Sequence, residues 1–126
     1  MKKIINTPKS PAPIGPYNQA ILAGDTLYIS GQIPIDPGTG DLVAGDIKKE
    51  TKRSMENLKA ILEEAGMSFD QVVKCTIFIK DMAQFGDINE VYGSYFNADT
   101  APARETVEVA NLPKDVRVEI SAIAVR

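Results

Sequence analysis

The sequence predicts one α+β domain, in which a mixed β-sheet carries two helices packed on one of its faces. The chain has 126 residues, which is the length of one ordinary domain, so we expect residues 1–126 to fold around a single core. Segments that alternate apolar and polar residues, as strands do, are interrupted by only two segments with helical spacing. The predicted order is therefore β, β, β, α, β, α, β, β, and two helices can cover only one face of such a sheet.

Three strands are expected before residue 32. An edge strand at Lys3–Asn6 gives way to an extended loop, because three prolines fall within residues 8–13. A second strand runs to about Ala23, and a third covers Thr26–Ser30. Gly24-Asp25 lies between them and suits a two-residue type II′ turn, which requires glycine at its first central position.

Gly31 closes the third strand, and two interpretations of it stay open. A glycine there usually marks a bulge or a strand end, but it also lets a ligand approach the backbone closely. Residues 33–45 then form a loop rich in proline and glycine. This loop contains no phosphate-binding motif.

The first helix is predicted at Ile47–Ala65, with Asp46 as N-cap and Gly66 just beyond its end. Its apolar stripe consists of Ile47, Thr51, Met55, Leu58, Ile61, Leu62 and Ala65. Lysines near its start form a solvated face in this interpretation, because no aromatic residues interleave with them as in a nucleic-acid site.

The clearest strand is Val72–Lys80. Alternation places Val73, Cys75, Ile77 and Ile79 on one face. Cys75 is therefore expected to be a small core residue and not a nucleophile.

The second helix is predicted at Met82–Phe96, where Asp81 and Gln84 resemble a capping box. Its buried stripe would consist of Met82, Phe85, Ile88, Val91, Tyr92 and Tyr95. Gly86 and Gly93 each destabilise a helix by about 1 kcal/mol relative to alanine, so we expect close packing against them. Asn89 lies at the edge of the stripe.

The segment Pro102–Ile120 is predicted to be two strands joined by a turn. In the first strand, alternation places Val107 and Val109 on one face and Arg104, Thr106 and Glu108 on the other. In the second strand, it places Val116, Val118 and Ile120 on one face and Arg117, Glu119 and Ser121 on the other. If both apolar faces enter the core, Arg104 and Glu119 lie together on the opposite side of the sheet. Such a pair can be an ordinary ion pair. Alternatively, the arginine guanidinium holds the carboxylate of a ligand, and the glutamate carboxyl group beside it accepts or donates protons.

Several classes of function are excluded by composition. The sequence has no histidine, which rules out Ser-His-Asp and Cys-His catalysis and any histidine-containing metal site, and one cysteine cannot form a thiolate site alone. The net charge of −3 does not favour nucleic acid or an anionic membrane. We expect no membrane span and no secretory signal, and the single cysteine fits a reducing cytoplasm.

The sheet face without helices carries charged residues as well as apolar ones, so it is not an ordinary core. Ile123, Val125 and the region of Ile29 supply enough apolar area for an interface, and we expect a partner subunit to cover this face.

Five segments that span nearly the whole chain follow one another in a specific order and spacing. They are Ile14–Ala20, Ser30–Pro34, Pro37–Gly40, Asn89–Tyr92 and Pro102–Ile120. Together they resemble the reactive-intermediate deaminase A family, also called RidA or YjgF.

The resemblance implies a chorismate-mutase-like fold that assembles as a homotrimer with a central β-barrel and active sites between subunits. It implies hydrolysis of reactive enamine and imine acids, such as 2-aminoacrylate, to 2-keto acids and ammonia without a metal or cofactor. Carried over by position, Arg104 grips the substrate carboxylate and Glu119 activates water. The residues that line the pocket would be Tyr17, Ser30, Gly31, Asn89 and Thr106.

Two positions depart from the family pattern. Glu105 stands where relatives usually have a small or apolar residue, and alternation points it away from Arg104. Ser121 stands at a position that is often acidic and would alter the pocket rim.

Two other functions compete with the deaminase. One is a non-catalytic or regulatory trimer that binds small carboxylic acids, for which the arginine alone would suffice. The other is cleavage of RNA, which the net acidity and the absence of histidine disfavour.

Overall fold

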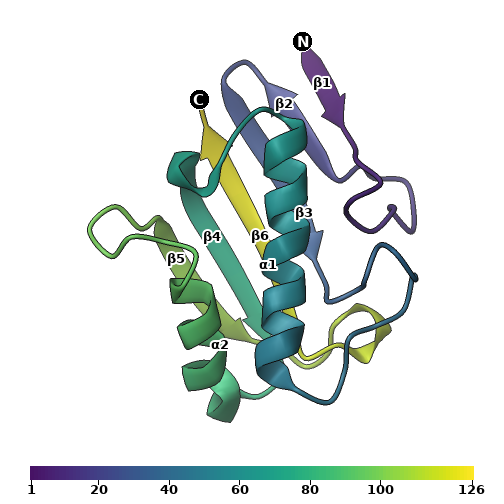
Figure 1. Cartoon of the computed structure of the whole chain (residues 1–126), viewed down its shortest axis with the longest axis vertical. Coiled ribbons are helices and arrows are strands. Elements are labelled where there is room, and N and C mark those ends of the chain that lie inside the picture. The colour runs from purple at the N-terminus through teal and green to yellow at the C-terminus, as the bar shows by residue number, and fades with distance from the viewer.

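Six strands form one mixed sheet, and two helices lie on one of its faces (Figure 1). The computed structural model describes all residues, 1–126. The strands are β1 (Lys2–Ile5), β2 (Ala20–Ala23), β3 (Thr26–Gln32), β4 (Val72–Ile79), β5 (Ala103–Glu108) and β6 (Val118–Val125), and the helices are α1 (Ile47–Glu64) and α2 (Phe85–Gly93). Short 3₁₀ turns cover Phe69–Gln71, Met82–Gln84 and Pro113–Asp115. The predicted fold class and element order are confirmed.

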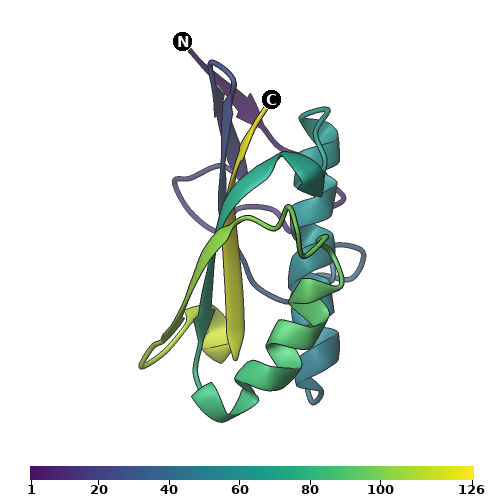
Figure 2. The ribbon, with the colours of Figure 1, turned by 90° about the vertical axis from the view of Figure 1, so that its left-hand side faces the viewer.

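The strands are arranged in the order β1-β2-β3-β6-β4-β5 across the sheet. All neighbours are antiparallel except β4 and β5, which run parallel. Both α-helices, α1 and α2, lie on the same side of the sheet in the edge-on view (Figure 2). We call the uncovered side the open face. Neither helix is long and apolar enough to cross a membrane.

The core lies between the helices and the sheet. Leu58, Ile61 and Leu62 of α1 are fully buried and pack in one cluster with Ile77 of β4 and Ile120 of β6. Full burial of each such side chain contributes about 1.5–3 kcal/mol. The helix-facing residues of β6 therefore include Val118 and Ile120, and alternation directs Glu119 to the open face.

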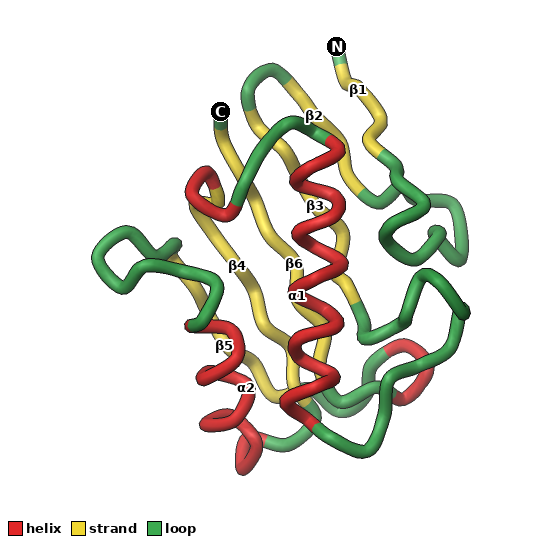
Figure 3. Tube along the Cα trace, viewed as in Figure 1, coloured by secondary structure: helices red, strands yellow, loops and turns green.

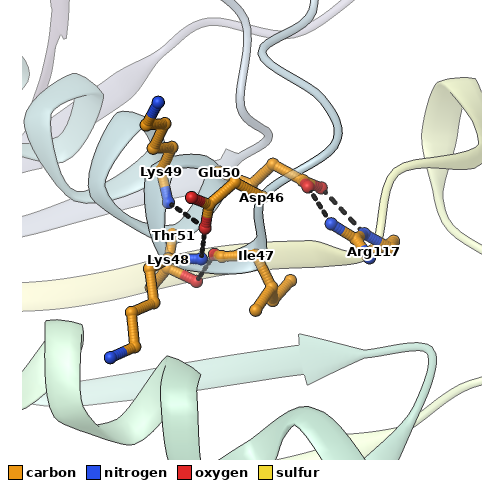
Figure 4. Close-up of polar contacts among 7 residues, drawn as sticks. All are labelled: Asp46, Ile47, Lys48, Lys49, Glu50, Thr51 and Arg117. Carbon is orange, nitrogen blue, oxygen red and sulfur yellow. Dashed lines mark hydrogen bonds and ion pairs between the residues drawn. The ribbon is translucent and has the colours of Figure 1, made fainter.

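Helix α1 begins as its sequence predicts. The Asp46 carboxylate accepts hydrogen bonds from the backbone N–H groups of Lys48, at 2.9 Å, and Lys49, at 3.4 Å (Figure 4). These bonds satisfy donors that the first turn of a helix leaves without partners. The turn between β2 and β3 is also as predicted, because Gly24 has φ 60° and lies between the paired residues Ala23 and Thr26.

The two strands predicted within residues 102–120 are present as β5 and β6, but they do not lie side by side in the sheet. Strand β4 lies between β5 and β6 and pairs with both of them. In β5 the register places Arg104 beside the buried Cys75, so it is the polar set of β5 that faces the helices. Val107 is instead 40% exposed on the open face. Arg117 was predicted to share a face with Glu119, but its guanidinium binds Glu50 on α1, on the helix side.

Two further predictions fail locally. The register of β4 shifts between Val72 and Lys74, so Val72 is buried and Val73 is 48% exposed. The second helix is shorter than predicted, and Met82 in the preceding turn is exposed. A side chain at Gly86 or Gly93 would meet only open space, so close packing does not explain these glycines.

Candidate active site

A cavity of about 620 Å³ lies on the open face, where β3 and β6 meet three long loops. These loops are residues 6–19, 33–46 and 109–117, and each contributes to the cavity wall. Figure 3 draws them in green, except for the short 3₁₀ turn Pro113–Asp115, which is red. The lining residues are Ile14, Tyr17, Ser30, Gly31, Ile33, Pro113, Lys114 and Glu119. Four of the predicted site residues are therefore brought together, namely Tyr17, Ser30, Gly31 and Glu119.

Glu119 is the one carboxylate in this cavity, and it fills the space above Gly31. A Cβ atom added to Gly31 would lie 1.9 Å from Oε2 of Glu119, so no larger residue fits without displacing the carboxylate. Gly31 also lies in a bulge, since the pairing of β3 with β6 shifts between Ile29 and Gln32. Gly31 therefore marks a bulge, as the first interpretation predicted. A side chain also approaches its backbone closely, as in the second interpretation, but that side chain is Glu119 and not a ligand.

Burial raises the pKa of the Glu119 carboxyl above its ordinary value. The shift arises because a partly buried carboxylate loses hydration, and Glu119 forms no ion pair that would compensate for that loss. Such a carboxyl group is better suited to exchange protons near neutral pH than a solvated one.

The wall that carries Tyr17 is held by hydrogen bonds to neighbouring backbone. The Tyr17 hydroxyl accepts from the N–H of Ile14 at 3.2 Å, and the Ser30 hydroxyl donates to the carbonyl of Asn18 at 2.7 Å. Gln19 is buried and acts as an internal brace for this loop. Its Oε1 accepts from the N–H of Thr7 at 2.7 Å, and its Nε2 donates to the carbonyl of Pro11 at 2.8 Å.

Arg104 lies on the other side of the sheet, against α2. Its Nη1 donates to Oδ1 of Asn89 at 2.6 Å, and its guanidinium carbon lies 5.0 Å from the ring centroid of Tyr92 and 5.5 Å from that of Phe85. Stacking on two aromatic rings fixes the guanidinium plane, while its other N–H groups remain free to bind a ligand. The hydroxyl of Thr106, two residues along β5, is buried without a hydrogen-bond partner.

The seven predicted site residues thus form two groups within one chain. Tyr17, Ser30, Gly31 and Glu119 line the cavity, whereas Arg104, Asn89 and Thr106 face the helix side. The expectation that Arg104 and Glu119 share one face of one sheet is wrong, because β5 presents its polar residues to the helices.

The two departures from the family pattern lie outside the cavity. Glu105 accepts from the Thr76 hydroxyl and pairs with Lys74 at 3.1 Å, on the open face and away from Arg104 as predicted. These contacts lower the pKa of Glu105. Ser121 lines a separate hollow of about 180 Å³ beside Tyr28 and Thr76, so it does not form the rim of the cavity.

Sequence reasoning missed four residues of the cavity wall, Ile14, Ile33, Pro113 and Lys114. Lys114 and Asp115 have φ of 55° and 57°, in the left-handed region that side chains rarely adopt. The sequence signal was the dipeptide Pro113-Lys114 shortly before β6, but nothing in it indicates this conformation.

A second hollow, of about 360 Å³, lies between the helices and is lined in part by Lys48, Lys49, Lys52 and Glu90. Glu90 is paired with Lys48 and raises the pKa of that ammonium group. This hollow has no free carboxylate comparable to Glu119, so the cavity on the open face is the better candidate.

Comparison with known proteins agrees with the fold. The family described as endoribonuclease L-PSP matches residues 7–126. A RutC family protein of Pyrococcus abyssi is 57% identical over 98% of this chain and 96% of its own. A 2-iminobutanoate/2-iminopropanoate deaminase of mouse is 48% identical over 100% of this chain and 93% of its own.

Solved structures show the same fold. A protein of the conserved Rid family from Yersinia pestis has a TM-score of 0.97 and 48% identity, and the match covers 100% of both chains. TdcF of E. coli, solved with bound serine, has a TM-score of 0.93 and 48% identity, and the match covers 98% of both chains.

Proposed function

This chain belongs to the endoribonuclease L-PSP family, which includes the Rid proteins, and on that premise we propose that it hydrolyses reactive enamine and imine acids. The products would be 2-keto acids and ammonia, and 2-aminoacrylate with its imine tautomer is the simplest substrate. The observation that carries the proposal is Glu119, a half-buried carboxylate without a cationic partner, in a cavity large enough for a small acid. The name of the mouse relative, a deaminase of 2-iminobutanoate and 2-iminopropanoate, supports the same reaction.

The proposed mechanism needs only orientation and one proton shuttle. Water beside Glu119 attacks the imine carbon, which is already electrophilic, and Glu119 accepts the proton that the water loses. Glu119 returns that proton to the nitrogen, which gives the neutral carbinolamine. The hydroxyl proton of the carbinolamine then passes to the nitrogen by way of Glu119, the C–N bond breaks, and ammonia leaves as the carbonyl forms. Fixing the substrate and the water together contributes several kcal/mol, about the amount that proximity gives in comparable reactions.

Arg104 is proposed to hold the substrate carboxylate, and this role requires a second copy of the chain. Arg104 and Glu119 lie on opposite faces of one sheet, so one substrate meets both only if Arg104 comes from the partner subunit. The open face supports such an assembly because Tyr28, Val73 and Val125 are each at least 40% exposed there or at its edges. A homotrimer with three such sites agrees with the family resemblance, and a heterologous interface of this kind closes into a ring.

A non-catalytic binder of small carboxylic acids is the second candidate. The bound serine in TdcF of E. coli supports this candidate, since that relative binds an amino acid. Glu119 argues for the enzyme, because binding a small acid would need only the arginine, whereas a carboxyl group in the cavity adds a group that can accept and return a proton. RNA cleavage is not proposed, since Lys114 is the single cation that lines the cavity. A cytoplasmic location is proposed because Cys75, the only cysteine, is free and buried.

The experiment couples a serine dehydratase or an amino-acid oxidase to this protein and times imine disappearance over several side chains. We expect saturable acceleration in the wild type, its loss in Arg104→Ala, and low turnover with retained binding of 2-oxobutanoate in Glu119→Gln. Calorimetric binding of 2-oxobutanoate without any acceleration would establish the binder and refute the enzyme.

A further inference from the structure

The cavity is braced from behind by buried polar side chains on α1. Glu50 and Asn57 are 3% and 0% exposed, and they lie seven residues apart, so they occupy the same face of the helix two turns from each other. Arg53 lies between them and donates from Nε to Oδ1 of Asn57 at 3.1 Å. Buried polar groups need partners, and the partners of this row lie in two loops that line the cavity.

Asn57 holds the loop that carries Ile33. Its Nδ2 donates to the carbonyl of Ile33 at 3.2 Å and to the carbonyl of Ile35 at 3.0 Å. Both N–H groups of the amide are thereby used, and its oxygen is used by Arg53. The position of Ile33 in the cavity wall therefore depends on a side chain that does not itself line the cavity.

Glu50 holds the opposite loop through Arg117. The Arg117 guanidinium donates from Nε to Oε1 of Glu50 at 3.1 Å and from Nη2 to Oε2, which is the two-point contact drawn in Figure 4. Arg117 ends the loop that places Lys114 in the wall, and it stands two residues before Glu119. The same loop is tied by the ion pair of Lys80 with Asp115.

The two loops also contact each other. Val116 packs with Ile33 and Ile35 in a small apolar cluster separate from the main core. The hydrogen bonds of Glu50 and Asn57 thus act on the two sides of one packed unit. Removing Arg117 would leave the buried Glu50 carboxylate without its cationic partner, which is strongly destabilising, so the pair is not an exchangeable surface contact.

We propose that Glu50, Arg117 and Asn57 are positioning residues, which hold the two loop walls in place around Glu119 and so keep its carboxyl group partly buried. The catalytic part of this inference rests on the proposed function, whereas the positioning part concerns the cavity alone. Because the pKa of Glu119 is raised by burial, opening either wall should return that pKa toward the ordinary value of about 4.3.

The test measures the titration midpoint of the Glu119 carboxyl by ¹³C NMR in Arg117→Lys, Glu50→Gln and Asn57→Ser. The control is Lys52→Gln, an exposed residue on the same helix that does not line the cavity. We expect the titration midpoint of Glu119 to be lower in the three variants and unchanged in the control. We also expect kcat/KM for an imine to fall about tenfold in the three variants, because the carboxyl group is then misplaced. Tyr17 and Lys114 are the other ionisable groups of the cavity. Each midpoint is therefore also measured in a second set of proteins that carry Lys114→Met, so that a movement of the lysine charge is not taken for a change in the burial of Glu119.

A midpoint that stays at the wild-type value in all three variants would overturn the proposal, even if their Tm falls. Arg117→Lys keeps the charge but not the two-point contact, so it remains informative if Glu50→Gln does not fold. If the wild type shows no imine turnover, the proposed function fails, but the midpoints still decide whether these residues position the walls.

Discussion

Replacing Gly31 by alanine tests whether the placement of Glu119 controls activity. The new Cβ would lie 1.9 Å from Oε2, 2.7 Å from Cδ and 2.9 Å from Cγ of Glu119. Ordinary contact begins at 3.4 Å, so the carboxylate must retreat by about 1.5 Å. The displaced group is the end of a flexible side chain, so we expect a cost in stability of only about 0.5–1.5 kcal/mol.

The expected loss of activity is much larger than the loss of stability. A displacement of about 1 Å at a reacting group can reduce the rate about 100-fold, so kcat/KM for 2-iminobutanoate should fall by at least about that factor. Gly86→Ala is the matched control, because nothing lies within 4 Å of the added Cβ and alanine stabilises a helix by about 1 kcal/mol. The measurements are imine disappearance and a thermal melt on each purified variant.

Two results would refute this reasoning. One is a Gly31→Ala variant whose kcat/KM stays within about twofold of the wild type. The other is a Gly86→Ala variant that loses activity to the same extent, because the effect would then not depend on the contact with Glu119.

Three further predictions concern other groups. Arg104→Lys should lower kcat/KM more than tenfold, about the value of one lost two-point contact, and a variant as active as wild type would exclude a forked grip on the carboxylate. The raised pKa of Glu119 favours the protonated form in the folded chain, so this contribution to stability is present below about pH 4.3 and is lost as pH rises through the folded pKa. Glu119→Gln should therefore have a higher Tm than wild type at pH 8 and the same Tm at pH 4. A higher Tm for the variant only at low pH would contradict the raised pKa. Burial raises the pKa of the Cys75 thiol to about 11, so a disulfide reagent at pH 8 should label it only in denaturant, and rapid labelling of the native protein would contradict its place in the core.

The pattern of the sequence predicts elements well where one side of each is buried. Helix α1, its N-cap Asp46 and the turn at Gly24 follow from local spacing and local hydrogen bonding, and each is confirmed. Strand order is not a local property. Val107 and Val109 were expected to face the core, but β5 is an edge strand, and its residue Val107 is exposed on the open face, while Val109 lies beyond the end of the strand.

The sequence allowed the candidate site residues to be named, but not the face of the sheet on which each of them lies. Glu119 was placed correctly on the face without helices, whereas Arg104 was placed on the wrong one, because alternation within a strand does not determine which set is buried. The roles of Glu50 and Asn57 were invisible in the sequence. Their partners, Arg117 and the carbonyl of Ile33, are 67 and 24 residues away.

The most direct test of the central claim mixes two inactive variants. Arg104→Ala and Glu119→Gln are each expected to lack turnover alone, since each removes one half of every site. If a substrate is held by Arg104 of the partner subunit beside Glu119, co-refolding equal amounts should restore about a quarter of the wild-type rate, because random assembly of a ring makes about one site in four intact. A mixture as inactive as its components, with mixed oligomers confirmed by native mass spectrometry, would contradict a site shared between subunits.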